Sequence, residues 1–344
     1  MGNHIVNRSL GNRNGAARVD VSFDESQALP VVWPAGKQFA FTIVDDTDAS
    51  TVENTRPIYD FLAGHGLRTT KTVWPLAPAA RSVTGGDSLE NPAYRDWILE
   101  LKAHGFEIGL HGVSDGSSPR SRVVQGLDRF EEILGADPEI YVNHTGQAES
   151  MYWGTQRVDP PIRWIYDAYC RSKGYPAFQG ADRLSPHFWG DLCWQRTKYV
   201  RNLVFTDINT LKMDPLMPYH DPRRPFVRYW FSSSYGSNVD DFCELLSERN
   251  QDRLIAEGGA CIVYTHFSAG FCPMTPLLQR LIRRIAGMPG WFPPASTLLD
   301  FLGDRRGWRD AADQKMLFQR MQWRWFRDQA LRISQKRSGR LVHR

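Results

Sequence analysis

Residues 39–48 read FAFTIVDDTD, a short apolar run that ends in a cluster of carboxylates. The run is rich in aromatic and β-branched residues, which is typical of a buried strand. The side chains of Asp45, Asp46 and Asp48 follow at its carboxyl end. A buried strand that ends in polar residues predicts an α/β protein with a site at the ends of its strands.

The chain on both sides of this stretch alternates between strand-like and helix-like segments. Asn91 can cap one helix, Pro57 suits the first turn of another, and Gly66, Gly105 and Gly135 can each end one. Strands are expected at 39–44, 69–74, 106–110, 140–142, 199–207, 261–264 and 291–292. Helices are expected at 56–66, 92–104, 120–134, 239–257, 276–287 and 296–302. This rhythm favours parallel strands joined by crossover helices.

Residues 150–235 interrupt the rhythm and are rich in Trp, Tyr, Pro and Arg. We expect long connections and short helices in this segment, lying over the site. The sequence then divides into an N-terminal arm at 1–37, a main domain at 38–303 that includes this aromatic-rich insertion, and a basic helical tail at 304–344.

The composition is that of a folded protein: 344 residues, of which 42% are hydrophobic and 23% charged. No stretch approaches the ~18–20 apolar residues that span a bilayer. Residues 1–20 have no apolar segment of the kind that directs secretion. The five cysteines are an odd number without C-x-x-C spacing, which indicates reduced thiols. We therefore expect a cytoplasmic protein.

Charge is distributed unevenly along the chain. Residues 304–344 contain 12 Lys or Arg and 4 Asp or Glu, a balance of +8, whereas the whole chain has a net charge of +4. Residues 315–344 can form a basic helix with a broad apolar face that includes Trp323 and Phe326. Two interpretations stay open: the helix lies on the anionic inner face of a membrane, or it packs on the main domain. No motif predicts binding to nucleic acid.

Potential metal ligands follow four of the expected strands. They are the adjacent pair Asp45 and Asp46, then His111, His144 and His266. Carboxylate oxygen and imidazole nitrogen together suit Zn²⁺ or another first-row divalent ion. Each residue alone has an ordinary structural explanation, but their occurrence in order at successive strand ends predicts a metal site.

Three motifs, in this order, resemble those of the NodB-type polysaccharide deacetylases, carbohydrate esterase family 4. Residues 41–46, FTIVDD, are similar to the family's first strand, which ends in two aspartates. Residues 107–111, EIGLH, are similar to the start of its second motif, and residues 261–266, CIVYTH, to its closing strand. The resemblance extends over about residues 38–302. It implies a distorted (β/α) barrel with fewer than eight regular strands.

The resemblance also implies roles for individual residues. Asp45 would be the general base, Asp46 a metal ligand, His111 a second ligand, and His266 the general acid. Zinc, the first choice among divalent metals, would activate the acyl carbonyl and the attacking water.

Two departures from the family pattern concern the third metal ligand. The family has a second His four residues after the first, and this chain has Asp115 there. The family's third motif has an Arg followed by prolines, and this chain has Asn143-His144-Thr145-Gly146. We favour His144 as the third ligand because it ends a strand of its own, with Asp115 as the rival. The missing Arg leaves the base without the residue that would orient it.

These observations predict a metal-dependent hydrolase that removes an N-acyl group, with N-acetyl as first choice, from a sugar or glycan. A nucleotide- or lipid-linked precursor of surface polysaccharide or lipopolysaccharide is the expected substrate. Tryptophans of the insertion could stack on sugar rings, with Trp189 as first choice among Trp153, Trp164, Trp189, Trp194 and Trp230. Arginines could meet a carboxylate or phosphate, with Arg224 as first choice among Arg157, Arg163, Arg223 and Arg224. Asp207 could touch substrate or orient His266. Deformylation of a formamido sugar, or non-catalytic glycan binding on the same fold, are the alternatives.

Overall fold

The computed structural model describes residues 31–337 except 81, 145, 173–176 and 269. Most of the expected N-terminal arm and the last seven residues of the expected tail therefore lie outside the described residues. The chain divides into two compact units, residues 1–30 and 31–344, and all elements named below belong to the second.

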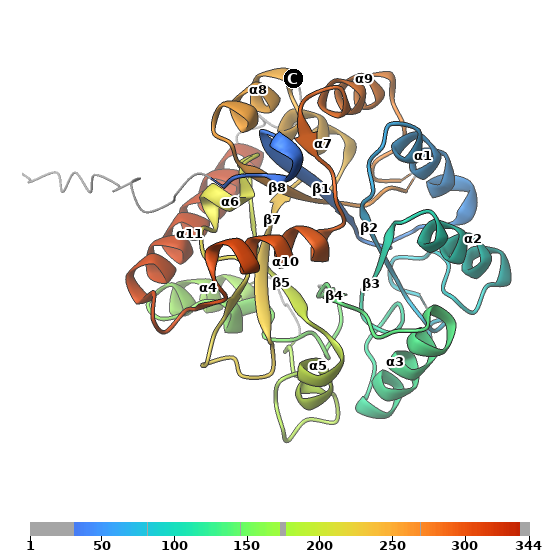
Figure 1. Ribbon diagram of the computed structural model, residues 1–344. Helices are drawn as coiled ribbons and strands as arrows, with labels where there is room; N and C mark the ends of the chain where they lie inside the picture. The colour runs from blue at the N-terminus through green and yellow to red at the C-terminus, as the bar shows by residue number, and fades with distance from the viewer. Residues whose placement is uncertain (1–30, 81, 145, 173–176, 269, 338–344) are drawn as a thin grey trace, which may run out of the picture. The chain divides into compact units, whose positions relative to one another are not determined.

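Seven parallel strands form a closed ring surrounded by helices (Figure 1). The ring order is β7, β5, β4, β3, β2, β1 and β8, and pairing of β8 with β7 closes it. The strands are β1 (Phe39–Asp45), β2 (Thr70–Val73), β3 (Glu107–Leu110), β4 (Ile140–Tyr141), β5 (Tyr199–Phe205), β7 (Tyr229–Tyr235) and β8 (Ala260–Thr265). The short strands β6 (Tyr219–His220), β9 (Gly290–Trp291) and β10 (Arg309–Asp310) attach to the ring. The expected barrel with fewer than eight regular strands is confirmed.

Helices connect most of these strands, as the rhythm of the sequence predicted. They are α1 (Val52–Gly64), α2 (Pro92–Ala103), α3 (Arg120–Leu134), α7 (Val239–Leu245), α8 (Glu248–Ala256), α9 (Pro276–Ala286) and α10 (Ala295–Arg306). The side chain of Asn91 accepts from the amide of Ala93 at the start of α2, and Gly135 ends α3 with φ 74°.

Helix α1 begins four residues earlier than the expected Arg56. Thr51 and Asn54 each accept a hydrogen bond from the other's backbone amide, at 3.3 and 2.9 Å, and this reciprocal cap fixes the start at Val52. Pro57 consequently lies inside the helix rather than in its first turn.

Residues 150–235 contain more regular structure than the sequence indicated. They hold two of the ring's strands, β5 and β7, besides a 3₁₀ turn, η3 (Gly154–Arg157), and the helices α4 (Ile162–Ser172), α5 (Gly190–Arg196) and α6 (Thr210–Met213). Strand β7 has the sequence YWFSSSY, and its three serines are fully buried. Two of them are hydrogen-bonded: Ser232 donates to Asp214, and Ser234 donates to the carbonyl of Asp207.

Alternate residues of the strands face two different hydrophobic clusters. In β1, the aromatic residues Phe39 and Phe41 pack with α1, α2 and α9, whereas Ala40 and Val44 pack with α10. The amide of Ala295 donates to Thr70 Oγ1 (2.9 Å) at the start of β2, so α10 covers the amino end of the ring. The opposite, carboxyl end is left for the site.

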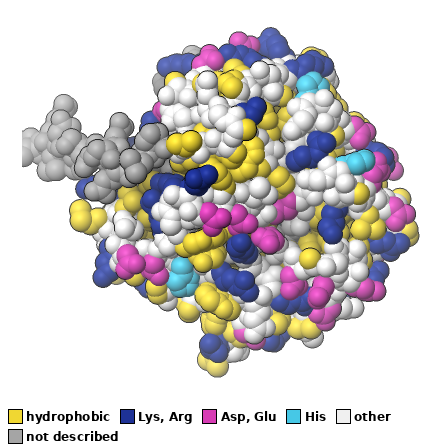
Figure 2. Space-filling view, viewed as in Figure 1, with side chains coloured by type: hydrophobic (Ala, Val, Ile, Leu, Met, Phe, Trp, Pro, Cys, Tyr) yellow, Lys and Arg dark blue, Asp and Glu magenta, His cyan; other side chains and the backbone are white. Residues whose placement is uncertain are grey.

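The last described helix, α11 (Lys315–Arg337), packs on the ring, as the second interpretation of the basic tail expected. It contacts β5, α4 and α6, and it buries Phe318, Met321 and Trp325. On the face viewed in Figure 1, positive, negative and hydrophobic side chains are interspersed (Figure 2). Within the described ranges, no helix combines the length and the apolar character needed to cross a bilayer.

Candidate active site

The site residues continue the inward-facing side of their strands beyond the carboxyl end of the ring. Ala40 and Val44 face inward in β1, and Asp46 follows two residues later on the same side. Ile140 and Val142 likewise face inward, and His144 follows two residues after Val142 on the same side, beyond the end of β4.

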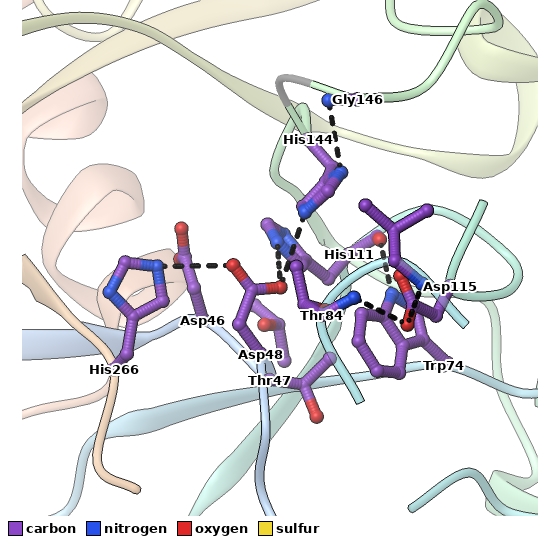
Figure 3. A network of polar contacts seen from close by, with 12 residues as sticks. Asp46, Thr47, Asp48, Trp74, Thr84, His111, Asp115, His144, Gly146 and His266 are labelled. Carbon is purple, nitrogen blue, oxygen red and sulfur yellow. Dashed lines mark hydrogen bonds and ion pairs between the residues drawn. The ribbon is translucent and has the colours of Figure 1, made fainter. Parts of the chain in front are cut away.

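Asp48, His111 and His144 converge in the loops after β1, β3 and β4 (Figure 3). Oδ1 of Asp48 lies 3.4 Å from Nε2 of His111 and 3.4 Å from Nε2 of His144. The three candidate ligand atoms all lie within 4.8 Å of one another, and all three residues are buried. Among the residues described, Asp48 Oδ1 and both ring nitrogens of His111 have no hydrogen-bond partner.

These unpartnered atoms suit a divalent metal. Buried polar atoms are nearly always satisfied, so Asp48 Oδ1 and His111 Nε2, which face each other at 3.4 Å without a hydrogen bond, indicate a missing partner. A carboxylate oxygen with two imidazole nitrogens is a donor set that zinc and related ions accept. Burial opposes ionisation of Asp48, but the three surrounding imidazoles outweigh it and hold the pKa of its carboxyl far below the usual value.

One contact of His144 would have to change when a metal binds. The backbone amide of Gly146 donates to Nδ1 of His144 at 3.2 Å. A neutral imidazole that accepts at Nδ1 carries its proton on Nε2, where the metal needs a free lone pair. Metal binding through Nε2 therefore requires this contact to open and the proton to move to Nδ1.

Asp46 is held by an arginine that the sequence analysis missed. Nη1 and Nη2 of Arg201 donate to the two carboxylate oxygens of Asp46 at 2.8 and 2.5 Å, and both residues are buried. Burial raises the pKa of Asp46, but the charge and hydrogen bonds of Arg201, together with the charges of His111 and His266, outweigh it, so the pKa is lowered. Arg201 comes from β5, whereas the family's arginine was expected after β4. Arg201 lies two residues after the buried, inward-facing Tyr199, and alternate residues of a strand face the same side. This alternation along β5 is the signal that could have identified Arg201.

His266 faces the same cluster from the end of β8 (Figure 3). Its Nδ1 lies 2.9 Å from the carbonyl oxygen of Ser237, so Nδ1 carries a proton. Its Nε2 lies 3.3 Å from Oδ2 of Asp48. Burial lowers the pKa of His266, but the hydrogen bond to Asp48 and the charges of Asp46 and Asp48 raise it more, and the net shift is upward.

Asp45, the expected general base, does not line the cavity. Its carboxylate accepts from Tyr59 Oη (3.0 Å) and from the amide of Phe267 (2.7 Å), and it pairs with Lys71 Nζ at 3.0 Å. Asp45 and Lys71 are fully buried. Asp45 lies on the outward side of β1, next to α1, and it joins four segments of the fold instead of facing substrate.

Asp115, the rival third ligand, is engaged elsewhere through Oδ2, whereas its Oδ1 is buried without a described hydrogen-bond partner. Its Oδ2 accepts from the backbone amides of Val83, Thr84 and Gly85 at 2.8, 2.9 and 3.0 Å, and from the hydroxyl of Ser82. The carboxylate thus holds the 82–85 loop in place. The structure brings His144, and not Asp115, to His111.

The cluster of Asp48, His111 and His144 lines a cavity of about 610 Å³. Asp46, Asp48 and the three histidines line one part of it. The remaining wall is aromatic and basic, and comes largely from the η3–α4 segment and from α11. It includes Trp153, Arg157, Tyr166, Tyr169, Arg201, Tyr235, Tyr264, Trp325 and Arg332.

Trp189, Arg224 and Asp207, which were expected to bind substrate, do not line this cavity. Trp189 is buried, and its indole N–H donates to the carbonyl of Glu149 (2.7 Å). Arg224 is buried in an ion pair with Asp221. Asp207 pairs with Arg253 at 2.9 Å. Hydrogen bonds and ion pairs hold all three, so their polar groups are used within the fold.

Comparison with known proteins finds similar folds among solved structures. No protein-family model matches the chain, and no curated protein matches its sequence. A candidate polysaccharide deacetylase from Mycobacterium smegmatis is 15% identical, with a TM-score of 0.48 over 81% of this chain and 95% of that one. The peptidoglycan deacetylase PdaC from Bacillus subtilis is 12% identical, with a TM-score of 0.38 over 81% and 96%.

An enzyme of another kind, Puue allantoinase, is 13% identical, with a TM-score of 0.45 over 80% of this chain and 94% of that one. Polysaccharide deacetylases are thus among the solved structures that this chain resembles.

Proposed function

We propose that this protein is a metal-dependent hydrolase that removes an N-acyl group, with N-acetyl as first choice, from a sugar. The observation that carries the proposal is the buried cluster of Asp48, His111 and His144 with unpartnered ligand atoms. Beside this cluster, the carboxylate of Asp46, which Arg201 orients, and the imidazole of His266 line the same cavity. That combination is what hydrolysis of an amide requires.

Asp48, His111 and His144 would hold the metal, with zinc favoured by the two imidazoles. When bound, the metal supplies a Lewis acid for the acyl carbonyl. These roles differ from those that the family resemblance implied. The carboxylate ligand is Asp48 instead of Asp46, and the general base is Asp46 instead of Asp45.

Two side chains then move protons. Arg201 fixes the carboxylate of Asp46, and each of its oxygens keeps a lone pair that can accept a proton from the attacking water. His266 directs Nδ1 to the carbonyl of Ser237, which leaves Nε2 to deliver a proton to the departing nitrogen. Positioned groups of this kind contribute about 10²–10⁴-fold each.

The aromatic wall supports a sugar substrate, because flat side chains such as Trp153 and Tyr235 can stack on sugar rings. Our proposal places the substrate among cytoplasmic precursors of surface polysaccharide, linked to a nucleotide or a lipid. In the lipid-linked case, the basic side of α11 would contact the inner face of the membrane. The same site would also release formate from a formamido sugar.

Metal content of the purified protein tests the cluster. We expect about one equivalent of zinc or a similar ion in the wild type, and its loss in Asp48→Asn, His111→Ala and His144→Ala. Matched variants of the displaced candidates, Asp45→Asn and Asp115→Asn, should keep the metal. Absence of metal from the wild type, even after incubation with zinc, would favour the non-catalytic glycan-binding alternative.

Release of acetate and of formate tests the chemistry, with N-acetylglucosamine oligosaccharides, UDP-N-acetylglucosamine and a formamido sugar as substrates. Asp46→Asn and His266→Ala should keep the metal but lose at least about 10²-fold in turnover. Full turnover in either variant would contradict the role assigned to that residue.

A further inference from the structure

Three arginines are buried in the described part of the chain, and two of them are paired with carboxylates. Arg201 pairs with Asp46, and Arg224 pairs with Asp221. Arg157 is equally buried, with 8% of its surface exposed. Among the residues that the structure describes, it has no carboxylate within ion-pairing distance.

The contacts of Arg157 hold the guanidinium without neutralising it. Its carbon Cζ lies 3.8 Å from the ring centroid of Trp153 and 5.2 Å from that of Trp325. Nη1 donates to the backbone carbonyl of Asn202 (3.0 Å), where β5 has an irregular register against β7. Nε is buried and has no hydrogen-bond partner among the described residues.

A buried charge without a counter-charge is unfavourable, because the group has lost its hydration. Contacts with aromatic faces return only part of that loss. The guanidinium lines the cavity that holds the metal cluster. An anion that enters this cavity would therefore supply the missing counter-charge.

Arg332 adds a second positive charge to the same wall. It lies on α11, lines the cavity, and stacks on Tyr235, with Cζ 3.6 Å from the ring centroid. Asp328, one turn earlier on α11, is the nearby carboxylate, and Thr206 occupies its oxygens through the backbone amide and the hydroxyl. Of the acidic groups that line the cavity, Asp46 is paired with Arg201, and Asp48 lies 3.3–3.4 Å from the imidazole nitrogens of the three histidines.

We propose that Arg157, assisted by Arg332, binds an oxyanion, phosphate or carboxylate, carried by the substrate. This inference rests on the proposed function and narrows its substrate to an acidic N-acylated sugar, such as a sugar phosphate or a uronic acid. A guanidinium is weakly hydrated and presents paired N–H donors to planar or tetrahedral oxyanions. Of the four arginines expected to meet an anion, Arg157 lines the cavity, whereas Arg224 is paired with Asp221.

Isothermal titration calorimetry on the full chain in the presence of EDTA tests the proposal without depending on turnover. The probes are N-acetylglucosamine 1-phosphate, glucuronic acid, inorganic phosphate and neutral N-acetylglucosamine. The wild type should bind at least one sugar-borne anion roughly tenfold or more tightly than the neutral sugar. Binding of inorganic phosphate alone would show whether the sugar is needed.

Arg157→Gln should weaken binding of the preferred anionic sugar by about 10–100-fold and leave neutral N-acetylglucosamine unchanged. Arg332→Gln should give a smaller loss. Arg163→Gln is the matched control, because Arg163 is an exposed arginine six residues along the same segment and should have no effect. If Arg157→Gln does not fold, Arg157→Lys, which keeps the charge but not the fork of donors, should retain only part of the preference.

A wild type with no preference for either anionic sugar would overturn the proposal, and so would an undiminished preference in folded Arg157→Gln. Because the assay contains no metal, failure of the proposed hydrolysis would leave these results intact. Conversely, turnover of neutral and acidic sugars at equal rates, with equal binding, would refute the anion site and leave the hydrolase standing.

Discussion

Two adjacent aspartates, Asp45 and Asp46, lie on opposite sides of β1 and therefore have different surroundings. Asp46 faces the cavity and Arg201, whereas Asp45 faces α1 and pairs with Lys71. The pair of Asp45 with Lys71 is fully buried, and Tyr59 donates a further hydrogen bond to it. The carboxylate of Asp45 is thus fully used in contacts within the fold.

We expect Asp45→Asn to destabilise the protein by about 3–5 kcal/mol, because it leaves the buried ammonium of Lys71 without a counter-charge. Metal content should stay at the wild-type level. Urea unfolding and elemental analysis check the two parts. Loss of metal from a variant as stable as the wild type would return Asp45 to the metal site.

The sequence predicted the three histidines and Asp46, which line the cavity, and also Asp45, which does not line it. His111, His144 and His266 follow directly from strand ends, and the structure brings all three to Asp48. Motif matching favoured two adjacent carboxylates, although adjacent residues of a strand face opposite sides. The large residues Phe39 and Phe41 mark the outward side of β1, and that alternation distinguishes Asp45 from Asp46.

Glu149 connects two loops at the level of structural elements. Its Oε2 accepts from the amide of Ser118 at 3.0 Å, which joins the loop after β4 to the loop after β3. The other oxygen, Oε1, is buried without a described partner. Burial raises the pKa of Glu149 to about 7.

The raised pKa makes stability depend on pH. Between the ordinary pKa of about 4.3 and about 7, the folded state holds a proton that the unfolded state has lost, so stability falls as pH rises. Glu149→Gln removes this effect. Its unfolding free energy relative to the wild type should therefore increase by about 1–3 kcal/mol between about pH 5 and pH 8.

Urea unfolding of both proteins at the two pH values measures this difference. Glu139→Gln is the control, because the Glu139 side chain is exposed and its substitution should give no change between the two pH values. An equal difference for Glu149→Gln at both pH values would show that the folded protein does not raise the pKa of this carboxyl.

Helix α11 forms a wall of the cavity through Trp325, which is 2% exposed and contacts Arg157 and Tyr166. Trp325→Ala should cost about 3–5 kcal/mol of stability. It should also weaken binding of the acidic sugar probe, with metal content unchanged. Trp323→Ala removes the same side chain at a 45% exposed position of the same helix, and a cost within about 1 kcal/mol is expected. Equal losses in thermal stability and affinity for both variants would contradict this role of α11.

The elements that the sequence predicted least well are those fixed by distant contacts. The alternation of strands and helices up to β4 follows from apolar spacing, caps and glycines, all of which are local signals. Strand β7 carries three serines, and its place in the ring depends on partners such as Asp214, which lies 18 residues away from Ser232. No local pattern contains that information.

The unit formed by residues 31–344 gathers its chemistry at one end of a ring whose other end is covered. Parallel strands bring all their carboxyl ends to the same edge, which explains why side chains as distant as Asp48 and His266 meet. The order of the strands could be predicted from their succession in the sequence. Closure between β7 and β8 could not, because β7 was not recognised as a strand.

Helix α11 is the last of the described elements to be synthesised, after all the residues of the cluster of Asp48, His111 and His144. During synthesis Asp48, His111 and His144 are all joined to the chain before Trp325 and Arg332. At about 5–20 residues per second, the 23 residues of α11 take about 1–5 s to make. In the proposed function, the three metal ligands are therefore joined to the nascent chain before the wall that would hold a sugar exists. The order of translation would then set metal acquisition ahead of substrate recognition.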